Sequence, residues 1–488
     1  MPLHDKAFWF ICFFLGGILL ASFIVEWNER FLISFLAALF TAVIFLLSQS
    51  PRATWLSVLS LSIFLGSFYY FSYDTRQRDV VIPFGEKITL QAMVMDSSRG
   101  FEGQTLVLEL QTPYKGRVRA NVARYPAWEY GDRVDVLGAI KFPSEQSAKF
   151  LEKENIFGMV SFPQLTLVDK NNGSALKRVL LRIKNFSEIA FARALPPREA
   201  AFMAGLTLGE TAEFSKEFRE KMSDTGTTHL VALSGYNITI IAGAVMSILS
   251  FLWVSRRWQF VGSVSAILAF VVMTGAEASV VRAAIMGFIG LLANEVERAY
   301  SFRNAIAIAA FAMVLVNPKV LVWDVGFELS FLALLGLVYL RPAIVRFFNI
   351  NPKPGVLKWR ENLLATLAAQ LAVLPLILSR FGAFSMLSLI TNVLILAFVP
   401  ITMTLGFSIV AVALVSGTLA RFVGFIANLF VRYEMGVIDL FSRFKVLSLS
   451  FEHVGLWFSI IYYVCIISFV AWSFKKHKVR ENAEIALA

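Results

Sequence analysis

The sequence has few of the side chains that disulfide frameworks and metal centres need. Two cysteines are present, Cys12 and Cys465, and they lie near opposite ends of the 488-residue chain. The four histidines are scattered, and none has a second histidine at metal-ligand spacing. We therefore expect no disulfide-stabilised domain, no metal site and no cofactor.

Charged residues are also scarce, at 16% of the chain, whereas hydrophobic residues make up 57% and the mean hydropathy is +0.67. Soluble globular proteins are about half apolar, so this composition predicts an integral membrane protein. The formal net charge of +11 indicates basic cytoplasmic loops and by itself says little about DNA. The sequence has no glycine-rich phosphate-binding loop, so we do not expect the chain to drive transport with a nucleotide.

Residues 1–73 contain three hydrophobic runs, at residues 8–25, 31–47 and 54–71, joined by short polar links. Each run is long enough, or nearly so, to cross about 30 Å of hydrocarbon as a helix. The first run has no basic leader, so we interpret it as a retained span and not as a signal peptide. We expect these N-terminal transmembrane helices to anchor the protein.

Residues 74–170 differ from the rest of the chain, because polar and apolar residues alternate there and glycine and proline recur. This pattern predicts short strands and turns. A helix over residues 147–156 is expected between the fourth and fifth of five strands, at residues 87–96, 104–112, 116–124, 133–142 and 162–169. The arrangement favours a small Greek-key barrel of the OB type, a scaffold used to bind oligonucleotides and oligosaccharides.

One part of this β domain combines basic and aromatic residues without an intervening acid. Phosphates need cations and unpaired bases stack on flat rings, so this composition is typical of single-stranded DNA binding. The predicted DNA-binding residues are Lys115, Arg117, Arg119, Arg124, Tyr125 and Trp128. The alternative is that the arginines only alternate outward on an exposed strand.

Residues 171–225 are expected to lie at the membrane surface or to enter it only partly. Apolar residues recur at helical spacing over residues 174–195 among lysines and arginines, which predicts a basic amphipathic interfacial helix. Residues 200–208 and 213–222 are too short and too polar to span alone. We interpret them as re-entrant helices, which need protein or water around their backbone.

Residues 226–474 are predicted to form the main transmembrane bundle. Single spans are expected near residues 229–254, 258–274, 280–294, 305–316, 322–340, 363–378, 387–414 with Pro400 inside, and 456–474, and a weaker pair of helices at 419–447. Arginine and lysine clusters between the spans, and in a tail at 475–488, mark the cytoplasmic side. The predicted fold class is therefore a polytopic α-helical membrane protein with an inserted small β-barrel (OB-like) extracytoplasmic domain and a cytoplasmic C-terminus.

Polar residues inside this bundle are the candidates for a functional site, because unpaired polar groups in lipid cost free energy. The stretch GTTHLVALSGYNITII, from residue 226 to 241, contains a histidine, a Ser-Gly pair and a Tyr-Asn pair. Helix-breaking or polar residues recur in four later stretches. The candidates for channel lining or a polar network are His229, Ser234, Gly235, Asn237, Glu277, Ser279, Arg282, Asp324, Glu328, Ser330, Pro375 and Asn392.

Two of the candidate carboxylates, Asp324 and Glu328, are four residues apart and so share one helix face. Like charges on one face need a cation or a wet cavity, and Arg282 is the expected partner. The alternative for the whole set is a network of hydrogen bonds that holds helices together. A second alternative is a membrane-embedded hydrolase of an envelope polymer or lipid with Ser234 as nucleophile and His229 as base, but no orienting acid is evident. We expect no catalytic residues.

Three short motifs within the polar stretches of the bundle together resemble the ComEC family of competence proteins. The family has His-Leu followed by Ser-Gly, then Ala-Ser-x-x-Arg-Ala, then Asp-x-Gly-Phe-x-Leu-Ser-Phe. All three occur here in that order, beginning at His229, Ala278 and Asp324. Family members commonly have a second histidine after the Ser-Gly pair, where this chain has Tyr236. The resemblance implies an inner-membrane channel that passes single-stranded DNA into the bacterial cytoplasm during natural transformation.

The same resemblance implies which partners the chain needs. They are single-stranded DNA, membrane lipids, and DNA-receptor, nuclease and cytoplasmic motor proteins that other chains supply. Many family members also have a C-terminal metallo-beta-lactamase-like domain, whose His-x-His-x-Asp-His cluster does not occur in this sequence. We therefore expect no nuclease activity from this chain. A transporter of another anionic polymer remains an alternative, since an OB-type domain permits it equally.

Overall fold

The computed structural model describes residues 2–23, 35, 38–43, 47, 50–77, 79–100, 103–296, 301–350, 359–444, 448–450 and 455–487. It contains two compact units. Unit 1 comprises Met1–Leu181 and Ile248–Glu328, and unit 2 comprises Arg182–Ser247 and Leu329–Ala488. Each unit therefore combines segments that are distant in the sequence. The expected span at residues 31–47 lies mostly outside the described residues.

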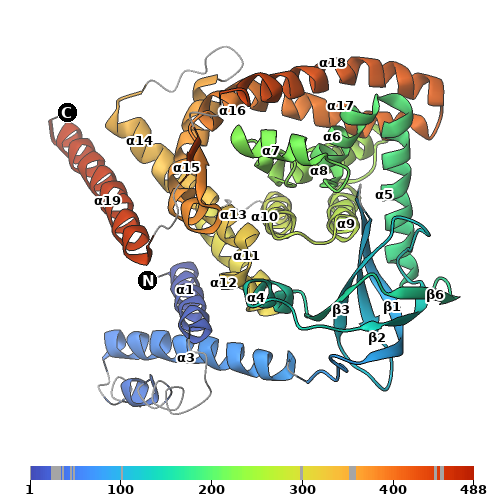
Figure 1. Cartoon of the computed structure of the whole chain (residues 1–488). Helices are drawn as coiled ribbons and strands as arrows, with labels where there is room; N and C mark the ends of the chain where they lie inside the picture. Colours follow the sequence, from blue (N-terminus) through green and yellow to red (C-terminus); the bar gives the residue numbers. More distant parts are fainter. Residues whose placement is uncertain are drawn as a thin grey trace. The chain divides into compact units, whose positions relative to one another are not determined.

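The N-terminal helices of unit 1 pack through glycine. Helix α1 (Leu3–Ser22) crosses helix α3 (Pro51–Gln77), as Figure 1 shows. A Cβ atom on Gly17 would overlap the carbonyl group of Ile63, and one on Gly66 would overlap the carbonyl of Phe14. Small residues let membrane helices approach closely, so these two glycines set the distance between the helix backbones.

The β domain of unit 1 is a single six-stranded sheet in the order β5-β3-β2-β1-β4-β6. Its strands are β1 (Lys87–Arg99), β2 (Gln104–Leu110), β3 (Arg117–Val122), β4 (Arg133–Ala139), β5 (Ile156–Ser161) and β6 (Gln164–Asp169). Strand β5 is parallel to β3 and all other pairs are antiparallel. The prediction of five strands missed β5, which follows the short helix α4 (Glu145–Lys153) directly.

Alternation along the strands builds the core of this sheet. On β1, Leu90, Ala92 and Val94 are buried between exposed or half-buried residues, and Leu106 and Leu108 do the same on β2. This is the period of two that the sequence predicts for strands with one buried face. Backbone hydrogen bonds of 2.9 Å also join residue 141 to Met159 of β5. The sheet is open in the observed strand order, so the expected closure into a barrel is not shown.

The remaining helices of unit 1 follow the expected apolar segments. They are α9 (Arg256–Met273), α10 (Ala278–Glu295), α11 (Phe302–Val316), α12 (Val320–Trp323) and the first turn of α13 (Val325–Leu335). The short helix α12 ends at Trp323, the backbone of Asp324 is extended, and α13 begins at the next residue. The predicted single span over residues 322–340 therefore has a break near its start.

Unit 2 begins in the amphipathic helix α5 (Ala175–Ala194), close to its predicted bounds. Its other helices are α6 (Pro197–Leu208), α7 (Lys216–Asp224), the 3-10 helix η1 (Thr228–Leu230), α8 (Gly235–Phe251), the π-helix η2 (Gly336–Leu340), α14 (Arg341–Phe347), α15 (Trp359–Phe381), α16 (Ser388–Leu396), α17 (Val399–Ala413), α18 (Gly417–Phe441) and α19 (Leu456–Leu487). Strands β7 (Ala383–Ser385) and β8 (Ser448–Ser450) form a separate two-stranded sheet.

Two helical predictions for unit 2 are corrected by the structure. Helices α16 and α17 are bent by 50° at a short break, so Pro400 lies at the start of a new helix instead of inside one span. Proline is tolerated in a first helical turn, where its missing N–H would have no intrahelical partner. The expected weaker pair of helices at 419–447 is one continuous helix through Phe441, capped by the Ser416 hydroxyl.

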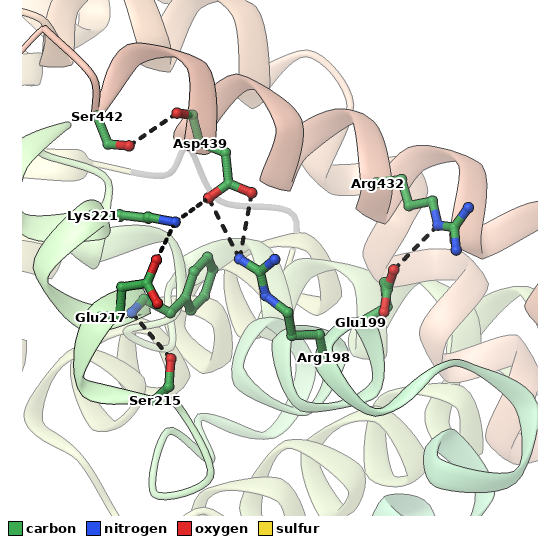
Figure 2. Close-up of polar contacts among 9 residues, drawn as sticks. Arg198, Glu199, Ser215, Glu217, Lys221, Arg432, Asp439 and Ser442 are labelled. Carbon is green, nitrogen blue, oxygen red and sulfur yellow. Dashed lines mark hydrogen bonds and ion pairs between the residues drawn. The ribbon is translucent and has the colours of Figure 1, made fainter.

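Helix α18 is held to α6 and α7 by ion pairs. Figure 2 shows Asp439 facing both Arg198 and Lys221, with N–O distances of 3.4 and 3.1 Å. Arg432 lies seven residues before Asp439 on α18 and pairs with Glu199 at 3.2 Å. These groups are partly exposed, so each ion pair adds little to the stability of the fold. Several pairs together contribute more. The pairs align the polar face of α18 with the short helices.

Six described helical segments are long and apolar enough to cross a membrane, or seven if the bent pair α16–α17 is one span. The six are residues His4–Ser22, Thr54–Gln77, Thr228–Phe251, Val325–Phe347, Trp359–Phe381 and Trp457–Lys476. This confirms a polytopic helical protein with a separate sheet domain. Helices α10 and α11 are apolar but shorter.

The glycine contact between α1 and α3 gives a test with a neighbouring control. We expect Gly17→Leu to destabilise the helix pair by about 1–3 kcal/mol or more, because its side chain meets the backbone of α3. Gly16→Leu should be tolerated, since nothing lies within 4 Å of a Cβ atom there. Thermal unfolding of the two variants in lipid nanodiscs measures the difference. Equal melting temperatures would contradict the close packing.

Candidate functional site

The first polar motif lies in unit 2 and starts in a non-helical segment between α7 and η1. Gly226 has a φ of +65°, the left-handed region that favours glycine, and a Cβ atom there would overlap the side chain of Ser388 on α16. The Thr391 hydroxyl of α16 donates to the carbonyl of Thr225 at 3.0 Å, and the Ser385 hydroxyl donates to that of Asp224 at 2.5 Å. Hydroxyl groups of residues 385–391 therefore donate to backbone carbonyls at the point where the chain leaves α7.

Ser234, Tyr236 and Asn237 form a reciprocal cap at the start of α8. The Ser234 hydroxyl accepts the Tyr236 amide at 3.3 Å, and the Asn237 Oδ1 atom accepts the Ser234 amide at 3.1 Å. This is a variant of the capping box, in which asparagine replaces glutamate at the third helical residue and the serine hydroxyl accepts the amide of the second. Asn237 is 2% exposed, and its Nδ2 atom donates to the carbonyls of Leu206 and Thr207 at the end of α6. The cap thus also joins α8 to α6, with Gly235 as the first residue of the helix.

His229 is exposed in η1, and its Nδ1 atom lies 3.1 Å from the carbonyl oxygen of Gly226. No hydrogen bond joins His229 to Ser234 in the described part of unit 2, and the hydroxyl of Ser234 is used in the cap. The pair therefore lacks the contact between base and nucleophile that a serine hydrolase needs.

Pro375 and Asn392 belong to neighbouring helices of unit 2. Proline has no N–H, so Pro375 inside α15 leaves the carbonyl of Leu371 without its helical donor. The Tyr462 hydroxyl of α19 donates to this carbonyl at 2.8 Å. Asn392 of α16 is 2% exposed, and its Oδ1 atom has no hydrogen-bond partner among the described residues.

The other candidates lie on α10 and α13. Glu277 precedes the first residue of α10, and Ser279 and Arg282 follow within its first two turns. Glu328 is in the first turn of α13, and Ser330 follows it. Unit 1 contains all of these except Ser330, whereas the first motif, Pro375 and Asn392 are in unit 2.

Asp324 occupies a defined position at the start of α13. Its Oδ1 atom accepts the amide of Phe327 at 2.9 Å, which caps the helix, and its Oδ2 atom lies 2.9 Å from the Nζ atom of Lys153. Asp324 and Glu328 therefore do not form an unneutralised pair, because Lys153 already neutralises one of them. The described residues contain no group of three or more histidines, cysteines or carboxylates able to hold a metal ion.

The predicted DNA-binding residues lie just before β3, on β3 and in the loop after it. Arg124 and Tyr125 are exposed, and Tyr125 has 76% of its surface accessible. Trp128 is 6% exposed and packs in the sheet core, so its ring is not available for stacking on a base. Arg119 is half-buried on β3.

Two of the predicted cations already have carboxylate partners. Lys115 contacts Asp79 at 2.6 Å, and this hydrogen bond lowers the pKa of the Asp79 carboxyl. Arg117 contacts Glu109 at 3.2 Å across the β2–β3 pair. Binding a phosphate at either position would compete with an existing ion pair.

The sequence reasoning missed several residues of these arrangements. No sequence pattern assigned a role to Lys153 or Lys319, although both are largely buried and paired with carboxylates. Phe162 is 73% exposed at the end of β5 with a φ of +49°, which is unusual for an aromatic residue. An available signal for the lysines was their position beside predicted helix ends. Phe162 had none, because its exposure depends on the strand that was missed.

Comparisons relate the chain to known proteins. A family model described as "Competence protein" matches residues 206–476, more than half of the chain. ComE operon protein 3 of Bacillus subtilis (strain 168) is 23% identical over 381 residues, which cover 75% of this chain and 48% of that protein. The chain therefore spans about half the length of this curated relative. No solved structure matches it significantly.

The cap of α8 gives a prediction that separates two roles of the motif. We expect Asn237→Ala to lower the free energy of unfolding by about 1–3 kcal/mol, because buried carbonyls of α6 lose their donor. Ser234→Ala removes only the cap and should cost about 1 kcal/mol. Denaturant unfolding in nanodiscs compares the two. A larger loss for Ser234→Ala would contradict this assignment.

Proposed function

Because the chain belongs to the competence protein family, we propose that it passes single-stranded DNA across the bacterial inner membrane into the cytoplasm during natural transformation. The observation that carries the proposal is the family match over residues 206–476, which covers all five polar stretches of the bundle. The apolar helices supply the membrane part of this function. In this proposal the C-terminus lies in the cytoplasm and the sheet domain on the outer side.

We place the conduit at the polar and irregular segments of the bundle. Segments that leave the helix at membrane depth persist where protein or water shields their backbone, as at translocation sites. The turn at Gly226, the cap of α8 and the break between α16 and α17 have this character. Near the turn at Gly226, His229 is exposed, and we propose that its ring faces the hydrated path.

We propose that the sheet domain receives the DNA on Arg119, Arg124, Tyr125 and Phe162. Strands β3 and β5 are parallel, and the amide of Phe162 donates to the carbonyl of Asn121 at 2.7 Å. Phe162 therefore follows the same end of the sheet as Arg124 and Tyr125, and Arg119 lies on β3 itself. Exposed rings and cations at one end of a sheet suit unpaired bases and phosphates. An OB-type fold and its closure into a barrel are part of this proposal.

The remaining steps of uptake require other proteins. As part of this proposal, strand degradation, DNA capture and the motor belong to separate nuclease, receptor and cytoplasmic motor proteins. The hydrolase alternative has less support, because the Ser234 hydroxyl accepts a backbone amide and is not bonded to His229.

The conduit proposal predicts a defect that is separate from folding. We expect His229→Ala to reduce entry of labelled DNA into the cytosol several-fold, because an exposed polar group on the path is lost, while the protein level in the membrane stays unchanged. Gly243→Ala on α8 is the control, since nothing lies within 4 Å of its Cβ position. Normal DNA entry in the His229 variant would argue against a conduit at this motif.

The receiving surface predicts salt-dependent binding of single-stranded DNA by the full-length protein in nanodiscs. Tyr125→Ala should weaken binding by about 1–3 kcal/mol, and Arg124→Ala should lower the slope of log affinity against log salt by about 0.7. Lys115→Ala should change affinity less, because Asp79 already neutralises Lys115. Tighter binding of acidic polysaccharide than of DNA would favour a transporter of another anionic polymer.

A further inference from the structure

Lys319 is a buried lysine in the turn between α11 and α12, and its side chain is 4% exposed. Its Nζ atom lies 2.8 Å from Asp74 Oδ1, at the C-terminal end of α3, and 3.4 Å from Glu152 Oε2 on α4. A buried ammonium group is unfavourable unless carboxylates replace its water. Lys319 therefore joins a membrane helix, a turn of the bundle and the helix of the β domain at one point within unit 1.

A second ion pair lies beside the first and connects the same helix to α13. The side chains of Lys153 and Asp324 are 11% and 15% exposed, and their charged atoms are 2.9 Å apart. The ion pair between Lys115 and Asp79, also in unit 1, has side chains that are 65% and 75% exposed. Water screens that surface pair strongly, whereas the pair at α4 is largely shielded from solvent.

Uncharged contacts complete the junction around α4. The Asn317 Nδ2 atom donates to the Lys153 carbonyl at 2.8 Å, and the Asn317 Oδ1 atom accepts the Lys319 amide at 3.0 Å. Lys149 lies over the Trp323 ring at 4.4 Å from its centroid. Residues of α4 thus contact Asn317, Lys319, Trp323 and Asp324.

We propose that α4 is a docking helix that fixes the β domain to the helices of unit 1, with Lys153 and Asp324 as its positioning residues. Asp324 then acts by holding the β domain in place and does not line the conduit. The docking of α4 does not depend on what the protein transports. Its consequence for DNA uptake rests on the proposed function.

The test compares Asp324→Asn with Lys153→Gln in the full chain. Asparagine still accepts a backbone amide at a helix N-cap, so Asp324→Asn keeps the start of α13 and removes only the charge. Hydrogen exchange of residues 145–155 in nanodiscs measures docking, and entry of labelled DNA into the cytosol measures function. Arg256→Gln, which breaks the more exposed ion pair between Arg256 and Glu295 in unit 1, is the matched control.

We expect both substitutions to accelerate exchange in α4 several-fold and to reduce DNA entry to a similar extent. The double variant should match the single variants, because both remove the same interaction. The control should change neither measurement. Docking would stand, and the proposed function would fail, if α4 responds as expected while the unmodified protein imports no DNA.

Two results would overturn the inference. If Asp324→Asn reduces DNA entry while Lys153→Gln changes neither exchange nor entry, Asp324 acts in the conduit itself. If neither variant accelerates exchange in α4, the ion pair between Lys153 and Asp324 does not hold this helix in place.

Discussion

Backbone groups that leave a helix among apolar neighbours must find hydrogen-bond partners, and this requirement shapes the helices of unit 2. At Pro375 the freed carbonyl of Leu371 accepts a bond from the Tyr462 hydroxyl. Between α7 and η1, the carbonyl of Thr225 accepts a bond from Thr391. In both places a side chain from a distant helix replaces the missing helical partner, so the irregular segments also join helices to one another.

The same requirement explains why the polar motifs have two roles at once. Asn237 caps its own helix through Oδ1 and binds the end of α6 through Nδ2, so one amide holds two helix ends. A network of hydrogen bonds between helices is therefore compatible with a path bordered by the same residues. A segment kept non-helical by such bonds has the irregular backbone that translocation sites use.

Charge is distributed differently in the two units. In unit 2, partly exposed ion pairs around Asp439 align α18 with α6 and α7. In unit 1, the pairs of Lys319 with Asp74 and of Lys153 with Asp324 are nearly buried, and the half-exposed Glu152 of α4 also contacts Lys319. Desolvation makes the second set costly to separate, because removing one partner leaves a buried charge.

The sequence by itself determined that this is a polytopic membrane protein, which residues form the β domain, and where most helices lie along the chain. These features depend on local composition and periodicity. It also located the polar motifs, whose residues are conspicuous among apolar neighbours. Only the tertiary structure decided what those residues contact. Trp128 is buried by strands that pair over long distances, and Asp324 meets a lysine 171 positions earlier in the chain. Such contacts arise from chain packing, which no local pattern encodes.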